Sequence, residues 1–169
     1  VDVEDKDQVA AIDAKTMTVT AKYELQGQGG TPAGLAFDVK NKILFVACRK
    51  PATMVMLDAK TGKIIGTAPL GTGTDGAVFN PATMEAFSTG GNGTLTIVKE
   101  KSPTSFEVEQ NLDTMNGART VTLDSKTGHL FTMSQERGPA PAAPAGGGRG
   151  RGRGGPVVPG SFTILMIGK

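Results

Sequence analysis

The sequence predicts an all-β protein: a β-propeller segment of about four blades of four-stranded antiparallel sheet, with incomplete blades at both ends. The composition is the first observation behind this fold class, because 24 glycines and 10 prolines accompany many residues that favour strands. The second is that short β-rich runs alternate with turn signals, while no window carries an apolar stripe of helical length. The third is an internal repeat of about 42 to 45 residues, a period typical of propeller blades.

Two series of segments carry this repeat. In the first, "IDAKTMTVTAKYEL" (12–25) aligns with "LDAKTGKIIGTAPL" (57–70). In the second, three segments align on an Asp or Asn and on a later Phe: "GLAFDVKNKILF" (34–45), "GAVFNPATMEAF" (76–87) and "ARTVTLDSKTGHLF" (118–131). The Asp-Ala-Lys-Thr turns are expected to be structural, because an Asp side chain accepts backbone N–H groups and a following Gly takes a positive φ.

The repeats define the order of the blades. The expected blades are a partial blade (1–25), two complete blades (33–70 and 75–113) and a last blade (118–135 plus 161–168). The first blade begins in its second strand, at 1–5, and the last blade lacks an outer strand, which gives roughly 14 strands. Residues 138–160 form a Pro/Gly/Arg-rich loop inserted in the last blade, because this composition cannot build a core.

An open arc of blades leaves two apolar faces in water, each larger than the patches that monomers usually expose. We therefore expect a partner: either the missing N-terminal blades of a longer chain or a second copy that closes the ring. The chain opens on "VDVEDK" without an initiator Met and without a signal peptide, which suggests a processed or truncated product.

Charge and cysteine content exclude several classes of function. The formal net charge is +2, and three of the positive charges lie in the inserted loop, so the body is close to neutral and lacks the basic face of a duplex-DNA binder. A single cysteine, Cys48, rules out an internal disulfide and a cysteine-rich metal site, and its apolar strand predicts a core position. No run reaches the length of an apolar membrane span.

The chain resembles the C-terminal half of the YVTN-repeat, YncE-like β-propeller proteins. The resemblance rests on "VEDKDQVAAIDAKT", "PAGLAFD", "LFVACRK", "DGAVFNPATMEAFSTGGNGTLTIVKE", "GARTVTLDSKTGHLF" and "SFTILMIGK", although "FVAC" stands where the family has its tetrapeptide. It implies a periplasmic or secreted binding or scaffold protein from a typically seven-bladed family. In that family the start of the chain usually supplies the outer strand of the last blade, and some members are associated with single-stranded DNA.

The candidate ligand site lies at the mouth of the central channel, on loops that lead into the innermost strands. Asp75 and Arg119 occupy related positions in successive blades and are expected to face each other, with Arg49 and Asn92 as weaker additions. An Arg fork beside a carboxylate either orients a carboxylate or phosphate ligand or simply forms a structural ion pair.

The sequence thus favours a non-catalytic binding or scaffold protein, for which we expect no catalytic residue and no cofactor. Two other functions stay open. A lactonase-like hydrolase would hold a divalent cation such as calcium in the channel, and the acids Asp2, Glu4 and Asp5 are weak candidates for cation ligands. Single-stranded nucleic-acid binding would use the arginines of the inserted loop, Arg149, Arg151 and Arg153, and would weaken steeply with salt.

Overall fold

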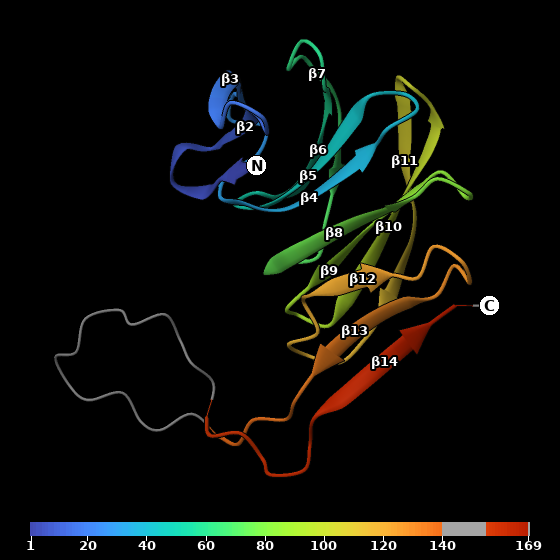
Figure 1. Ribbon diagram of the computed structural model, residues 1–169. Helices are drawn as coiled ribbons and strands as arrows, with labels where there is room; N and C mark the ends of the chain where they lie inside the picture. Colours follow the sequence, from blue (N-terminus) through green and yellow to red (C-terminus); the bar gives the residue numbers. More distant parts are fainter. Residues whose placement is uncertain (140–154, 169) are drawn as a thin grey trace, which may run out of the picture.

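The computed structural model describes residues 1–139 and 155–168, and within them the chain is an all-β arc of four antiparallel sheets (Figure 1). The predicted fold class, a β-propeller segment with incomplete blades at both ends, is confirmed. Two four-stranded sheets lie in the middle of the arc and a three-stranded sheet lies at each end.

The strands follow the chain order from sheet to sheet. The first sheet contains β1 (Asp2–Val3), β2 (Gln8–Asp13) and β3 (Thr18–Glu24). The second contains β4 (Pro32–Asp38), β5 (Ile43–Arg49), β6 (Ala52–Asp58) and β7 (Ile64–Pro69). The third contains β8 (Thr74–Asn80), β9 (Glu85–Gly90), β10 (Thr94–Ser102) and β11 (Ser105–Asp113). The fourth contains β12 (Val121–Leu123), β13 (Leu130–Ser134) and β14 (Thr163–Ile167).

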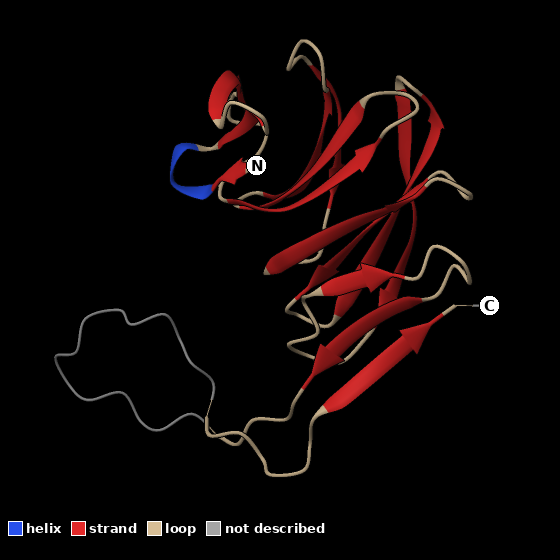
Figure 2. Cartoon of the chain, viewed as in Figure 1, coloured by secondary structure: helices blue, strands red, loops and turns tan. Residues whose placement is uncertain are grey.

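The sheets are arranged radially, as in a propeller (Figure 2). β4 packs beside β8, and β8 beside β12, so the innermost strands of successive sheets line one side of the arc. At the outside, β7 of the second sheet touches β11 of the third. Loops at the inner rim of different sheets therefore come close together although they are far apart in the sequence.

The core lies between neighbouring sheets rather than within any one of them. The cluster between the second and third sheets includes Phe45, which stacks on Phe79 with ring centroids 5.1 Å apart. A second cluster joins Val9 and Leu25 of the N-terminal part to Val55 and Leu57 of the second sheet. A third joins the third and fourth sheets through residues such as Leu95 and Leu130. Each sheet thus needs a neighbour to bury its apolar face.

The repeated Asp positions cap turns. Asp58 accepts hydrogen bonds from the backbone N–H groups of Lys60 (3.0 Å) and Thr61 (2.8 Å), and Asp13 does the same for Lys15 and Thr16. The hydroxyl and then the N–H of Thr61 hold the pKa of the Asp58 carboxyl below its usual range, and the N–H groups of Thr16 and Lys15 do so for Asp13, since these donors stabilise the ionised form. Asp13 and Asp58 therefore stabilise the hairpin turns, and the residues of the candidate ligand site come from other positions of the repeat.

The start of the chain differs from the expected strand over residues 1–5. β1 covers only Asp2–Val3 and a 3-10 helix follows at Glu4–Lys6, ending at Asp7 in the left-handed region (φ 52°). The side chain of Asp7 accepts a hydrogen bond from the N–H of Thr31 (2.6 Å), which ties this turn to the start of the second sheet. The helical turn carries Glu4 toward the inner rim.

The described residues contain no helix with the length and apolar character needed to cross a membrane.

Candidate functional site

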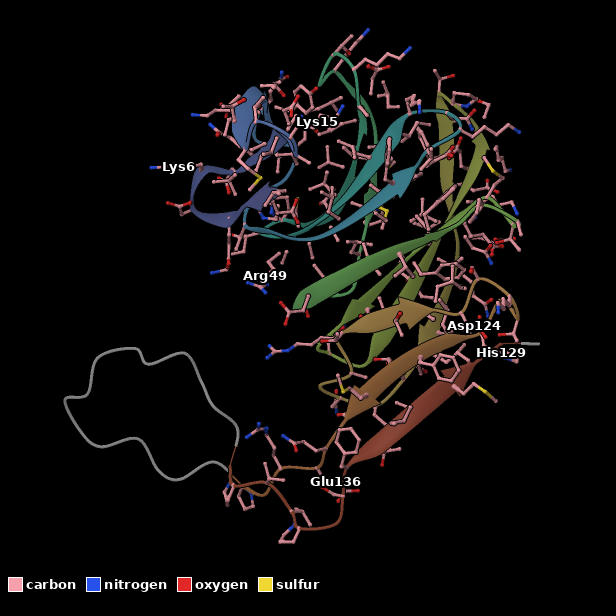
Figure 3. The ribbon with its side chains drawn as sticks, in the orientation of Figure 1. Lys6, Lys15, Arg49, Asp124, His129 and Glu136 are labelled. Carbon is pink, nitrogen blue, oxygen red and sulfur yellow. The ribbon has the colours of Figure 1, made fainter. Side chains whose placement is uncertain are left out.

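A chain of alternating charges runs along the inner rim and links the four sheets through Glu4, Arg49, Asp75 and Arg119. The Nη1 group of Arg49 donates to Oε1 of Glu4 at 2.7 Å, and its Nη2 group donates to Oδ1 of Asp75. The Nε group of Arg119 lies 3.2 Å from Oδ2 of Asp75. Figure 3 shows Arg49 projecting at this rim near the start of β8. Each charge thus comes from a different sheet or from a segment next to it.

Asp75 is aimed at both arginines by a β-bulge. The sequence places this residue on a loop, whereas the structure has it as the second residue of β8. Thr74 pairs with Gly90 and Gly76 pairs with Thr89, so Asp75 has no partner in the ladder between them. A bulge of this kind turns a side chain out of the regular pleat. A hydrogen bond of 2.6 Å between the hydroxyls of Thr74 and Ser88 holds the bulge in place.

Arg49 acts as a clamp between three sheets. It is the last residue of β5, and its N–H donates to the carbonyl of Gly30 at 3.1 Å. Beyond its two carboxylate partners, its Nε group donates to the carbonyl of Thr74 at 2.9 Å. All three nitrogens of its guanidinium therefore bind neighbouring elements, so its role is to hold the rim together.

Arg119 has unused hydrogen-bonding capacity. It lies in the segment that leads into β12, and its side chain is 60% exposed. Within the part of the chain that the structure describes, Asp75 is its one ion-pair partner, and the contact uses Nε alone. The two terminal nitrogens can then receive a carboxylate or phosphate in a bidentate fashion.

The other predicted ligand-site residue, Asn92, stays outside this chain of charges. It is exposed in the turn after β9, and its backbone N–H donates to the carbonyl of Thr72 at 3.3 Å. The loop arginines Arg149, Arg151 and Arg153 lie outside the described residues, so their role in nucleic-acid binding stays a prediction.

The acids considered as cation ligands do not converge. Glu4 is paired with Arg49, Asp5 is exposed in the 3-10 helix, and Asp2 lies half-buried on β1. Burial raises the pKa of Asp2 to about 6, because it penalises the charged carboxylate. Among the described residues, no group of three or more His, Cys, Asp or Glu side chains has the arrangement of a metal site. The rim lends no support to the hydrolase alternative, because its carboxylates, Glu4 and Asp75, form ion pairs with arginines.

Sequence reasoning missed one member of the rim chain, Glu4. Its signal was the acidic run at the start of the chain, which suggested weak cation ligands rather than a partner for Arg49. The pairing depends on the 3-10 helix that replaces part of the expected strand, and no other repeat within residues 1–139 and 155–168 has such a helix from which to infer it.

Comparison with known proteins supports the fold and goes no further. No protein-family model matches the chain, and no curated protein matches it either. Hydrazine synthase of Kuenenia stuttgartiensis has a TM-score of 0.67 and 16% identity over 81% of this chain. A chain of the mitotic checkpoint complex has a TM-score of 0.63 and 16% identity over 76% of this chain. Both are β-propeller-type structures, and the matches span 38% and 40% of their chains.

Proposed function

We propose that this chain is a non-catalytic β-propeller binding or scaffold unit that receives an anionic group of a ligand or partner on Arg119. One observation carries the proposal: Asp75 fixes the Arg119 guanidinium through Nε, while the rest of this exposed group stays open at the inner rim. A guanidinium held in this way loses little side-chain freedom when an anion binds, which favours recognition.

The geometry also limits how tightly an anion binds. Hydrogen bonds to charged groups contribute about 1.5 to 3 kcal/mol each, and Asp75 opposes the approach of a second negative charge. A contact of this strength alone corresponds to a dissociation constant of about a millimolar or weaker. A biologically useful partner therefore adds contacts elsewhere, as expected for a carboxylate or phosphate on a larger molecule.

The proposed setting is the bacterial cell envelope, in the periplasm or outside the cell. The support is the resemblance of the segments from "VEDKDQVAAIDAKT" to "SFTILMIGK" to the YVTN-repeat, YncE-like proteins. The rim chain agrees with a scaffold role, because it ties together sheets that share few covalent connections.

The partner proposal adds further blades to the arc, supplied by a longer chain or by a second copy. The fourth sheet supports it, because Met133, Phe162, Ile164 and Met166 are exposed on or next to its strands. An apolar face on a blade is normally covered by the neighbouring blade.

The test is a titration with inorganic phosphate and with citrate, followed by amide and Arg side-chain signals in ¹H–¹⁵N NMR spectra. We expect the largest shifts at Arg119 and its neighbours, saturating at millimolar concentrations or above, and their loss in Arg119→Ala. Arg137→Ala is the matched control, because Arg137 is another exposed arginine close to the fourth sheet and belongs to no rim ion pair. Equal responses in the two variants would remove Arg119 from the proposal.

A further inference from the structure

Two buried carboxyl groups meet where the second sheet contacts the third. Asp38 is the last residue of β4 and is 1% exposed, and Glu100 lies on β10 and is 3% exposed. Buried carboxylates normally have a cationic partner. Among the described residues, however, neither group forms an ion pair, so another interaction must make their burial tolerable.

Counting hydrogen bonds leaves one oxygen on each carboxyl without a partner. Oδ1 of Asp38 accepts from the N–H of Lys40 at 2.9 Å, and Oε1 of Glu100 accepts from the side-chain amide of Asn41 at 2.6 Å. Oδ2 of Asp38 and Oε2 of Glu100 are buried without a partner. The Asn41 contact brings the turn that follows Asp38 directly against Glu100, and Asp38 acts on the pKa of Glu100 both through its charge and through a side-chain hydrogen bond. A single proton between them therefore satisfies both orphaned oxygens.

The electrostatics of the junction favour keeping that proton. Burial raises the pKa of Glu100, the amide of Asn41 lowers it, the charge and hydrogen bond of Asp38 raise it, and Lys40 lowers it. The raising effects prevail: burial, which penalises the charged carboxylate, is the largest of them, and the like charge of Asp38 adds to it.

We propose that Asp38 and Glu100 share one proton in the folded protein, so that the junction between the second and third sheets is a latch that weakens as the pH rises. The Oε2–H group of Glu100 donates to Oδ2 of Asp38, and loss of the proton leaves two negative charges in contact. This latch lies apart from the rim chain and does not depend on the function proposed for Arg119.

The surrounding groups leave few other sources of pH dependence. Asp38 at the end of β4 and Lys40 in the following turn are the charged groups that act on Glu100. From the turn before β9, the Met84 carbonyl accepts the N–H of Glu100, and β11 places Phe106 opposite it. The residue before Glu100, Lys99, points to the other side of the pleat, where its Nζ atom lies 3.6 Å from Oε1 of Glu85.

The sign of the pH effect follows from the raised pKa. The folded state holds the proton at a pH where the unfolded chain, with an ordinary Glu value of 4.5, has already released it. The stabilisation is complete below that unfolded value and disappears as the pH rises through the folded value. Within this window the unfolding equilibrium constant changes by up to about tenfold per pH unit for one proton.

The test compares urea unfolding midpoints of the wild type and Glu100→Gln between about pH 5 and about pH 9. The amide of Gln accepts from Asn41 and donates to Asp38 at every pH, so it replaces the protonated carboxyl. We expect the wild-type midpoint to fall as the pH rises relative to that of Glu100→Gln, and the variant to be more stable at the basic end. Glu107→Gln is the matched control and should parallel the wild type, because Glu107 is exposed and pairs with Lys101 at 2.6 Å.

A second variant covers the case in which Glu100→Gln fails to fold. The equivalent of Asp38 in the third sheet is Asn80, whose side chain accepts the N–H of Ala82 at 3.0 Å, so Asp38→Asn keeps the turn. Asp38→Asn should also reduce the dependence of the unfolding midpoint on pH.

The proposal of a shared proton would be overturned if the unfolding midpoints of the wild type and of the variants that fold changed in parallel with pH. Stabilisation by calcium chloride of the wild type but not of the variants would overturn it too, since the carboxylates would then hold a cation.

Discussion

At the residue scale, a polar side chain's position in the repeat determines whether it stabilises the fold or keeps free hydrogen-bonding groups for a ligand. Asp13 and Asp58 each use Oδ1 to accept hydrogen bonds from their own turns. Arg49 uses every part of its guanidinium to hold neighbouring sheets. Arg119 differs from these residues because most of its donor groups stay open, which is why the proposed function rests on it.

Cys48 provides a prediction at this scale. Its side chain is fully buried in the cluster between the first and second sheets, and burial, with smaller effects of Asp2 and Asp7, raises its pKa to about 12. Because the thiolate is the reactive form, we expect no alkylation by iodoacetamide in the native protein and complete alkylation in denaturant. Intact mass spectrometry measures both states. Rapid labelling under native conditions would show that this cluster opens.

The sequence predicts single residues unevenly, and the reason is physical. Asp75 and Arg119 could be linked because equivalent positions in neighbouring blades face the same rim. The choice of Arg49 as their partner could be suggested only weakly, since the bulge at Asp75 that directs the ion pair has no signal in the sequence. Glu4 could not be predicted, because its place depends on a turn outside the repeat.

At the scale of elements, close packing of the inner strands requires glycine. A Cβ atom on Gly34 of β4 would lie 2.6 Å from the carbonyl carbon of Gly76 on β8, and a backbone atom cannot move aside cheaply. This approach is what allows successive inner strands to line the channel side of the arc. The repeat predicts that these strands are neighbours, but only the structure shows how near the two backbones come.

Gly34→Ala should therefore destabilise the protein by about 1 to 3 kcal/mol, the usual range for overpacking. The measurement is the free energy of unfolding from urea titration. Gly138→Ala is the control, because its added Cβ would make only an ordinary contact of 3.6 Å with the carbonyl oxygen of Pro156. If both variants lose the same stability, the cost comes from the chain entropy of glycine and not from the contact between β4 and β8.

At the scale of the whole molecule, the sequence predicted the arc well because repetition makes the sheets alike. Strand periodicity, turn residues and the repeat all point to radially arranged sheets, and the structure has 14 strands in four such sheets over the described residues. The repeat does not reveal how the two end sheets of the arc differ from the two central sheets. Most of the exposed large apolar side chains on the described strands belong to the two end sheets, and the repeat does not indicate which partner covers them.

The fourth sheet gives the last prediction. Ile164 and Met166 of β14 are 64% and 63% exposed, and Met133 on the paired strand β13 continues the same face. If this face packs against another blade in a second copy, light scattering after size exclusion should give twice the chain mass, and the double variant Ile164→Lys/Met166→Lys should return it to the monomer. Val39→Lys is the control, because Val39 is equally exposed but lies in the turn between β4 and β5. A monomeric wild type would favour blades supplied by a longer chain, and a dimer that survives the double variant would place the contact on another face.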